Sequence, residues 1–226
     1  MQVPDITWPK DAAEAIAIQQ SLRQQVRIGA DDVPWGLIAG IDVSYDITNN
    51  LTRAVVVVLD AVTLTPVVPP VATQIDTQFP YVPGLLSFRE IPAILKALSY
   101  VEVRPDILMV DGHGIAHPRR LGIAAHLGVL MDMPSMGVAK KRLTGKYEEP
   151  ALEKGSMSPL IHREEQVGMV LRSKDRIKPL FVSPGHRLSL VQSVAVVKAC
   201  LTKYKLPEPT RLADAISKKP DAYMRG

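Results

Sequence analysis

The chain has 226 residues, of which 46% are hydrophobic and 22% are charged, and its formal net charge is +4 at pH 7. This composition is typical of a globular protein with one hydrophobic core, and it excludes a disordered or repetitive chain. The single cysteine excludes an internal disulfide and a cysteine-rich zinc site, and no apolar run reaches the roughly 18 residues of a membrane helix.

The first part of the chain predicts one helix followed by three strands. The amino-terminal segment lacks the basic start and apolar stretch of a secretion signal, so we expect a cytoplasmic protein without membrane association. Residues 10–27 have the apolar spacing of an amphipathic helix. Residues 37–45 and 53–60 are predicted strands, and an Asn-Asn pair between them indicates a hairpin. A third predicted strand, 67–73, completes an antiparallel meander.

From residue 87 onwards, predicted strands alternate with helices, as in parallel sheets that helices cover. The predicted elements are helix 87–100, strand 106–110, helix 121–131, strand 135–139, a hairpin of strands 167–172 and 179–182, and helices 189–204 and 210–217. The tail from Lys218 is predicted to fray. The order predicts an α/β fold whose mixed sheet, a meander followed by β/α units, is flanked by helices, with residues 1–226 as one domain.

Two aspartates follow apolar strand segments. Asp42 lies inside LIAGIDVSY, where an unpaired charge is costly, and Asp111 ends DILMVDG. Ligand sites in open α/β sheets lie at the carboxyl ends of strands. If the two strands are neighbours, both carboxylates reach one point and suit a hard cation such as Mg²⁺. The alternative is two aspartates that are satisfied separately in turns or at an edge.

Two further carboxylates have local explanations. Ser87 and Glu90 have the spacing of a capping box, in which Glu90 bonds back to the backbone at the helix start. Asp214 lies in the first turn of the helix predicted from residue 210, where an aspartate suits the helix dipole. Taken alone, neither residue predicts a metal ligand.

Basic residues concentrate in the second part of the chain. Residues 1–100 hold 6 Lys and Arg against 10 Asp and Glu, whereas residues 101–226 hold 21 against 13. This balance suits a polyanionic partner, although an unevenly charged solvated surface explains it equally well. Lys140 starts a Lys-Lys-Arg cluster that is either a solvated loop or, near a metal, a phosphate-binding group. His113, His117 and His186 lie in turns expected at the surface, without zinc-ligand spacing.

Six segments together resemble the endonuclease V family. They occur in the family's order and span most of the chain. Each segment alone is a weak signal, but six in order, including the proline-tyrosine-proline element, are highly specific. The segments are GIDVSY (40–45), PYVPGLLSFRE (80–90), VDGHGIAHPRRLG (110–122), GVAKKRLTG (137–145), SPGHRLS (183–189) and EPTRLAD (208–214).

The resemblance implies an RNase H-like fold and a DNA-repair nuclease. Such an enzyme recognises deoxyinosine and hydrolyses the second phosphodiester bond on its 3′ side, leaving 3′-hydroxyl and 5′-phosphate ends. The resemblance makes Asp42 and Asp111 the principal ligands of Mg²⁺. We expect that Mn²⁺ can substitute for this ion. Glu90 joins their acidic cluster, and Asp214 assists a second ion. Lys140 becomes the catalytic lysine at the scissile phosphate. The choice of Lys140 over Lys141 depends on motif position alone.

The resemblance also implies a wedge and a base-reading pocket. Tyr81, between Pro80 and Pro83, resembles the family's strand-separating wedge, since prolines restrict the loop that presents the ring. The alternative is an ordinary packed tyrosine. Backbone groups are expected to line the pocket for the flipped base, at Gly84, Leu86, Gly112 and Ile123. The nucleic-acid path is expected to follow His117, Arg119 and Arg120, with help from His186 and Arg187.

The implied partner is DNA containing deoxyinosine, single- or double-stranded, and the protein is expected to be a monomer. One alternative keeps the fold and changes the substrate to inosine in edited RNA. Another is a non-catalytic nucleic-acid-binding module, against which the presence of four carboxylates and Lys140 argues. A third is another RNase H-like nuclease, against which the wedge argues.

Overall fold

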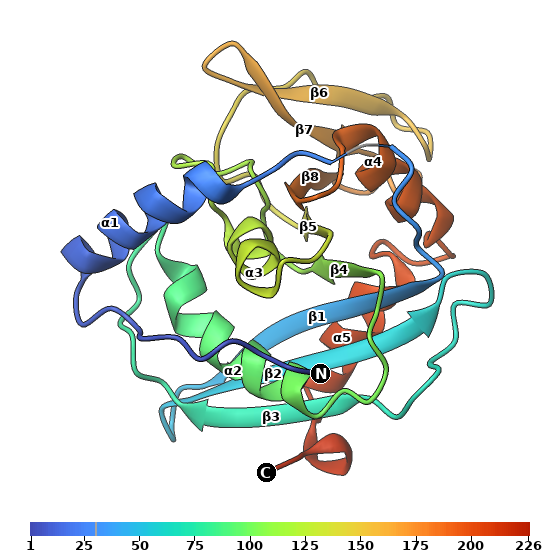
Figure 1. Cartoon of the computed structure of the whole chain (residues 1–226). Helices are drawn as coiled ribbons and strands as arrows, with labels where there is room; N and C mark the ends of the chain where they lie inside the picture. The colour runs from blue at the N-terminus through green and yellow to red at the C-terminus, as the bar shows by residue number, and fades with distance from the viewer. Residues whose placement is uncertain (30) are drawn as a thin grey trace.

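The computed structural model describes residues 1–29 and 31–226, whose strands form one eight-stranded sheet (Figure 1). The strands lie in the order β3-β2-β1-β4-β5-β8-β7-β6. Their bounds are β1 Leu37–Asp46, β2 Leu51–Asp60, β3 Val71–Asp76, β4 Ile107–Val110, β5 Ser135–Ala139, β6 Met157–His162, β7 Glu165–Leu171 and β8 Leu180–His186.

The sheet is mixed, and its pairing follows the chain. β1, β2 and β3 pair antiparallel, and the turn between β1 and β2 contains the Asn-Asn pair. β4 pairs parallel to β1, and β5 pairs parallel to β4. β8, β7 and β6 then extend the sheet antiparallel. The predicted meander followed by β/α units is therefore confirmed.

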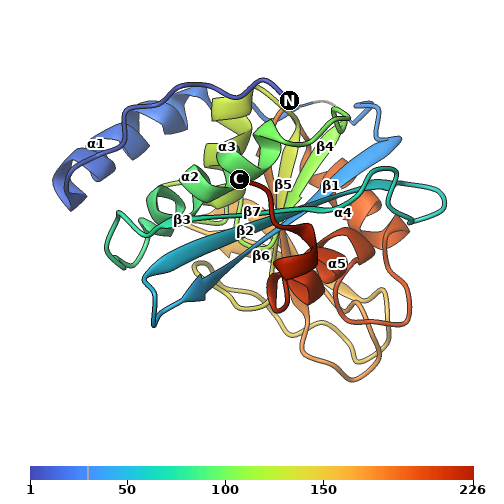
Figure 2. The same cartoon turned by 90° about the horizontal axis from the view of Figure 1, so that it is seen from below.

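Helices cover both faces of this sheet. α2 and α3 lie on one face, and α4 and α5 lie on the other (Figure 2). Alternation along β2 explains the two layers: Val56 packs toward α2, whereas Val55 and Val57 pack toward α5. The helix bounds are α1 Ala12–Leu22, α2 Leu86–Ser99, α3 Ile123–Met131, α4 Leu190–Ala199 and α5 Glu208–Ser217, with short 3-10 helices at Arg23–Gln25 and Asp221–Tyr223.

Three sequence predictions about elements were wrong. The strand predicted at 67–73 begins only at Val71, because Pro69 and Pro70 cannot donate to the ladder. The prediction missed β6, an edge strand that tolerates Pro159. The tail does not fray as predicted, since the Arg225 N–H donates to the Ala72 carbonyl over 2.8 Å and covers the β3 edge.

The pairing of β1 with β4 positions Asp42, which lies within β1, and Asp111, which follows β4. Ile41 of β1 pairs with Val110 of β4 in parallel register. The next residues along the two chain segments, Asp42 and Asp111, therefore lie side by side. β1 and β4 are therefore neighbouring strands, as the predicted shared cation site requires. Within the described part of the chain, no helix has both the length and the apolar character to cross a membrane.

Candidate active site

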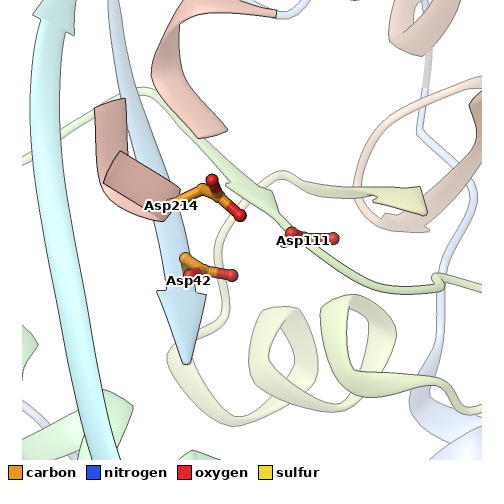
Figure 3. Close-up of side chains that lie close together, drawn as sticks. All are labelled: Asp42, Asp111 and Asp214. Atoms are coloured by element: carbon orange, nitrogen blue, oxygen red, sulfur yellow. The ribbon is translucent and has the colours of Figure 1, made fainter. Parts of the chain in front are cut away.

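Three carboxylates meet where β1, β4 and α5 converge. Oxygen atoms of Asp42, Asp111 and Asp214 all lie within 4.8 Å of one another, and their side chains point into one space (Figure 3). Gly40 makes this convergence possible, because a Cβ there would stand 2.0 Å from the backbone oxygen of Pro209 at the start of α5. A side chain at residue 40 would push α5, and with it Asp214, away from β1.

Asp42 is the most buried of the three, with 8% of its surface exposed. The pKa of Asp42 is raised from 3.8 to about 7, chiefly by burial. The hydrogen bond from Ser217 opposes this rise, and the charge of Asp111 adds to it. Ser217 Oγ donates to Asp42 Oδ2 over 2.6 Å. A carboxylate held in this way, beside two others, favours a cation that would neutralise it.

Lys140 bridges the other two carboxylates. It follows β5, and its Nζ lies 2.5 Å from Asp111 Oδ2 and 2.7 Å from Asp214 Oδ1. Burial lowers the pKa of Lys140, but its hydrogen bonds to Asp111 and Asp214 raise it more, so the pKa lies above its ordinary value. The lysine is therefore protonated at neutral pH. The neighbouring Lys141 instead offers its carbonyl to His113 Nε2 over 2.9 Å.

This donor set fits a divalent cation. Three carboxylates converge within 4.8 Å, and carboxylate oxygens are the ligands that hard ions such as Mg²⁺ prefer. Lys140 Nζ contacts Asp111 and Asp214, whereas the Asp42 carboxylate accepts its hydrogen bond from a neutral hydroxyl. The cluster thus keeps a negative charge that a divalent cation would balance.

Glu90 lies beside this cluster but is held separately. The capping-box interpretation was wrong: α2 begins at Leu86, and Ser87 Oγ contacts His126 Nδ1 over 2.9 Å. Glu90 falls in the second turn, where Tyr45 Oη donates to its Oε1 over 2.7 Å. The pKa of Glu90 is raised to about 7, chiefly by burial. The hydrogen bond from Tyr45 opposes this rise, and the charges of Asp42 and Asp111 add to it.

The position of Asp214 also differs from the prediction. α5 begins at Glu208 rather than near residue 210, so Asp214 lies in the second turn, away from the positive end of the helix dipole. Its partners are Lys140 and Lys218, whose Nζ atoms lie 2.7 and 2.6 Å from its two oxygens. Burial raises its pKa, but these lysines lower it more. Asp214 is therefore ionised through its partners rather than through the helix dipole.

A cavity of about 290 Å³ opens beside the carboxylates. Two of its walls are the segment before and at the start of α2 and the segment between β4 and α3, and residues 141–143 after β5 also line it. The predicted pocket residues Gly84, Leu86, Gly112 and Ile123 all line it, together with Tyr81, Glu90, Asp111 and His117. A Cβ at Gly112 would stand 2.5 Å from Ile123 Cγ2, so only glycine permits this packing.

Tyr81 stands at the mouth of the cavity with 70% of its surface exposed. Pro80 and Pro83 on either side of it are exposed as well. An exposed aromatic ring on a proline-restricted loop does not contribute to the core, which argues against an ordinary packed tyrosine.

The predicted nucleic-acid path contains side chains that bind the protein itself. His117 is 3% exposed, so its expected surface position was wrong. Arg119 Nη2 donates to the Gly84 carbonyl over 2.8 Å. Arg120 donates from Nε and Nη2 to Glu165 over 2.9 and 2.8 Å, and from Nη2 to the His162 carbonyl over 3.0 Å.

His186 and Arg187 lie away from the site. His186 pairs with Ser135, the first residue of β5, whereas Lys140 follows the last residue of that strand. The two ends of β5 are roughly 15 Å apart at ~3.3 Å per residue. His186 is 3% exposed and accepts a hydrogen bond from the Arg27 N–H over 3.2 Å. The structure thus does not bring this pair to the carboxylates, because β8 runs antiparallel to β5.

Sequence reasoning missed Ser217 and Tyr45, which hold two of the carboxylates. Ser217 follows Asp214 by three residues, so helical spacing alone would have placed both on one face of α5. Tyr45 follows Asp42 by three residues in a strand, where alternation offers no such signal. The role of Tyr45 depends on α2 packing over β1.

The raised pKa of Asp42 predicts a stability change with pH. Between 3.8 and about 7, the folded protein keeps a proton that the unfolded chain has released, so the free energy of unfolding falls as the pH rises. Asp42→Asn removes this loss. We expect the Tm of Asp42→Asn, relative to that of the wild type, to increase as the pH is raised through this window in EDTA.

The difference between the two proteins is the quantity to measure. Burial lowers the pKa of His113 and of His117 to about 4, so these groups change the stability in the opposite sense. They are common to both proteins and cancel. A Tm difference that stays constant from pH 4 to pH 7 would contradict the prediction.

Comparisons with known proteins point to one family. Residues 20–215 match the sequence model of the family described as Endonuclease V. An Endonuclease V of Nostoc punctiforme is 52% identical over 215 residues, which cover 94% of this chain and 96% of that protein. The crystal structure of an Endonuclease V from Streptomyces avermitilis superposes with a TM-score of 0.89 at 43% identity, covering 95% of each chain.

Two more distant structures add a bound ligand and the fold. Endonuclease V of Ciona intestinalis, in complex with a 24mer DNA containing an inosine followed by a ribo-adenosine, superposes with a TM-score of 0.79 at 29% identity, over 93% of this chain and 97% of that one. Argonaute of A. aeolicus shares the fold alone, with a TM-score of 0.51 at 15% identity over 81% of this chain and 28% of its own. The expected RNase H-like fold is therefore confirmed.

Proposed function

Because the chain belongs to the endonuclease V family, we propose that it recognises deoxyinosine in DNA and hydrolyses the second phosphodiester bond on the 3′ side. The products are 3′-hydroxyl and 5′-phosphate ends, and the base stays in place. The observation that carries the proposal is the position of three carboxylates and Lys140 directly beside a cavity of about 290 Å³. A strand whose flipped base enters the cavity brings its backbone to the carboxylates.

We infer that Asp42 and Asp111 hold Mg²⁺, with Asp214 and Glu90 assisting and with Mn²⁺ as a substitute. When bound, the ion supplies positive charge that polarises the phosphoryl oxygens. Lys140 carries a permanent proton on Nζ and offsets the negative charge that develops on the phosphate. Asp111 and Asp214 orient that ammonium group through the contacts described above.

The cavity reads the base through backbone groups. Leu86 and Ser87 begin α2 and line the cavity, and the N–H groups of a first helical turn have no acceptor within the helix. Backbone groups of the cavity read the O6 and N1 positions of hypoxanthine, and these donors suit O6. Adenine has an amino group in place of O6, so a donor would face a donor. Cleavage of an unmodified adenine strand as fast as the inosine strand would refute this assignment.

Tyr81 acts as the wedge that fills the gap left by the flipped base. A ring inserted into the base stack is worth ~1–3 kcal/mol. We expect Tyr81→Ala to lower kcat/KM on inosine-containing duplex by about tenfold, and less on a single strand, where fewer stacked neighbours are parted. Tyr81→Phe keeps the ring and is the matched control. Equal losses on duplex and single strand would contradict the wedge role.

His117, Arg119 and Arg120 border the nucleic-acid path. Because their side chains already bind protein groups, we infer that they shape the path and leave direct phosphate contacts to other lysines and arginines. The single domain over residues 1–226, the monomeric state and the cytoplasmic location stay predictions.

The proposed function is tested with an end-labelled DNA strand that carries one inosine, beside an identical strand that carries adenine. We expect a single cut one nucleotide past the inosine, dependent on Mg²⁺, and no cut in the adenine strand. A matched RNA strand tests the alternative substrate, and faster cutting of that strand would favour inosine in RNA. Faster cutting of branched DNA or of a plain RNA–DNA hybrid would favour another RNase H-like nuclease.

A further inference from the structure

A fully buried amide connects α1 to both walls of the cavity. Gln19 lies near the carboxyl end of α1 and has no exposed surface. A buried polar side chain needs partners for its donors and its acceptor. Gln19 finds them in two segments distant in sequence, which are the loop that carries Tyr81 and the segment that leads into α3.

The side-chain amide donates to both segments at once. Gln19 Nε2 lies 2.9 Å from the carbonyl oxygen of Gly84 and 3.3 Å from that of Leu121. Both Gly84 and Leu121 line the cavity, and they belong to two different walls. Two carbonyl partners require the NH₂ end of the amide on this side, which fixes the orientation of Gln19. The contacts set the spacing of the two walls.

Arg119 closes the same network. Its Nε donates to Gln19 Oε1, its Nη2 donates to the Gly84 carbonyl over 2.8 Å, and its N–H donates to His117 Nδ1 over 3.1 Å. The Gly84 carbonyl thus accepts two side-chain donors and has a fixed direction. Gly84 has a φ of +80°, and a Cβ there would stand 2.8 Å from Arg119 Nη2, so the residue must be glycine.

The Tyr81 loop is held by these contacts and by the packing of Phe79, Val82 and Leu85 in a hydrophobic cluster with α1 and α2. Tyr81, Pro80 and Pro83 are exposed and add little packing, while the Leu85 N–H donates within the loop to the Val82 carbonyl. The Gly84 carbonyl, two residues before the start of α2, is the point where the buried hydrogen-bond network holds the loop. Movement of this carbonyl would displace the wedge and the first turn of α2 together.

We propose that Gln19 is a positioning residue for base recognition, which holds the two cavity walls at the separation that a flipped hypoxanthine requires. The proposal rests on the proposed function of the cavity. Gln19 lies one residue before the segment that the family's sequence model matches, 20–215, and its role follows from the contacts of this chain. Arg119 passes its effect to Gly84 and His117.

The test compares three variants of the full chain with the wild type. Gln19→Met keeps the length of the side chain and removes every hydrogen bond. Gln19→Glu keeps an acceptor for Arg119 but loses the donors to Gly84 and Leu121. Gln20→Met, on the exposed face of the same helix, is the matched control. The readouts are KM and kcat on the inosine strand, and amide hydrogen exchange at Gly84–Leu86 and at 121–123 without DNA.

Both Gln19 variants are expected to raise KM by about ten- to a hundredfold, since buried carbonyls lose their donors, with a much smaller change in kcat. Hydrogen exchange should accelerate in both walls, and Gln20→Met should match the wild type. Unchanged KM and exchange in a folded Gln19→Met, or wild-type behaviour of Gln19→Glu, would overturn the proposal. So would a loss confined to kcat.

Two further outcomes have defined meanings. If Gln19→Met does not fold, Arg119→Lys replaces it, because a single ammonium cannot make both the Gln19 and the Gly84 contact in the same geometry. An unchanged KM in that variant would overturn the proposal. If the wild type itself neither cuts nor binds the inosine strand, the proposed function fails, whereas hydrogen exchange still decides whether Gln19 holds the walls.

Discussion

Asp42→Asn is expected to lower kcat on inosine-containing DNA by about a thousandfold or more while the protein still binds that DNA. Asp42 is the most buried of three carboxylates whose oxygens lie within 4.8 Å of one another. The amide has one neutral oxygen in place of two charged ones, so the affinity for a divalent cation falls. The residues that line the cavity include Asp111 but not Asp42, so we expect DNA binding to survive the change.

The measurement is single-turnover cleavage at saturating enzyme over a range of Mg²⁺ concentrations, with binding measured in EDTA. Asp76→Asn is the matched control, because Asp76 is also an aspartate of a strand in the same sheet, β3, but is exposed. It should cleave like the wild type. If Asp42→Asn cut at more than about a tenth of the wild-type rate, Asp42 would not be a principal ligand. If the protein were a non-catalytic binding module, Asp42→Asn would keep its affinity for DNA and would have no cleavage activity to lose.

Lys140→Met carries the second largest expected effect, a fall in kcat of about a hundred- to a thousandfold with little change in KM. Removal of one charged donor at a developing negative charge typically costs this much. Nζ of Lys140 lies within 2.7 Å of both Asp111 and Asp214, so no other orientation of the ammonium group is favoured. Methionine keeps the length and the apolar stem and removes only the charge.

Lys141→Met is the natural comparison for this variant. Lys141 is the next residue in the chain, and its recorded contact to His113 uses the carbonyl, which the substitution keeps. The same cleavage assay should show a much smaller loss for Lys141→Met. If the two variants lost equal activity, or if Lys141→Met lost more, the assignment of the catalytic lysine would move to Lys141.

Local patterns predicted most elements of the fold because they depend on residues close in sequence. The apolar runs of β2 and β4 and the spacing of α2 each identify an element without reference to the rest of the chain. The failures were also local in origin. Two prolines delayed the start of β3, and one proline concealed β6, because proline has no N–H to donate.

The sequence by itself determined that Asp42 lies within one apolar strand segment, that Asp111 ends another and, through its motifs, which family the chain resembles. The tertiary structure decided that the two strands are neighbours. Only the tertiary structure decided which partner each group has. Asp214 reaches Asp42 because Gly40 lets α5 pack closely on β1, and Lys140 reaches both acids because β5 lies beside β4. Gln19 meets Gly84 and Leu121 across 65 and 102 residues. Periodicity records which face of an element is buried, whereas contacts at such separations depend on the order of strands and the packing of helices.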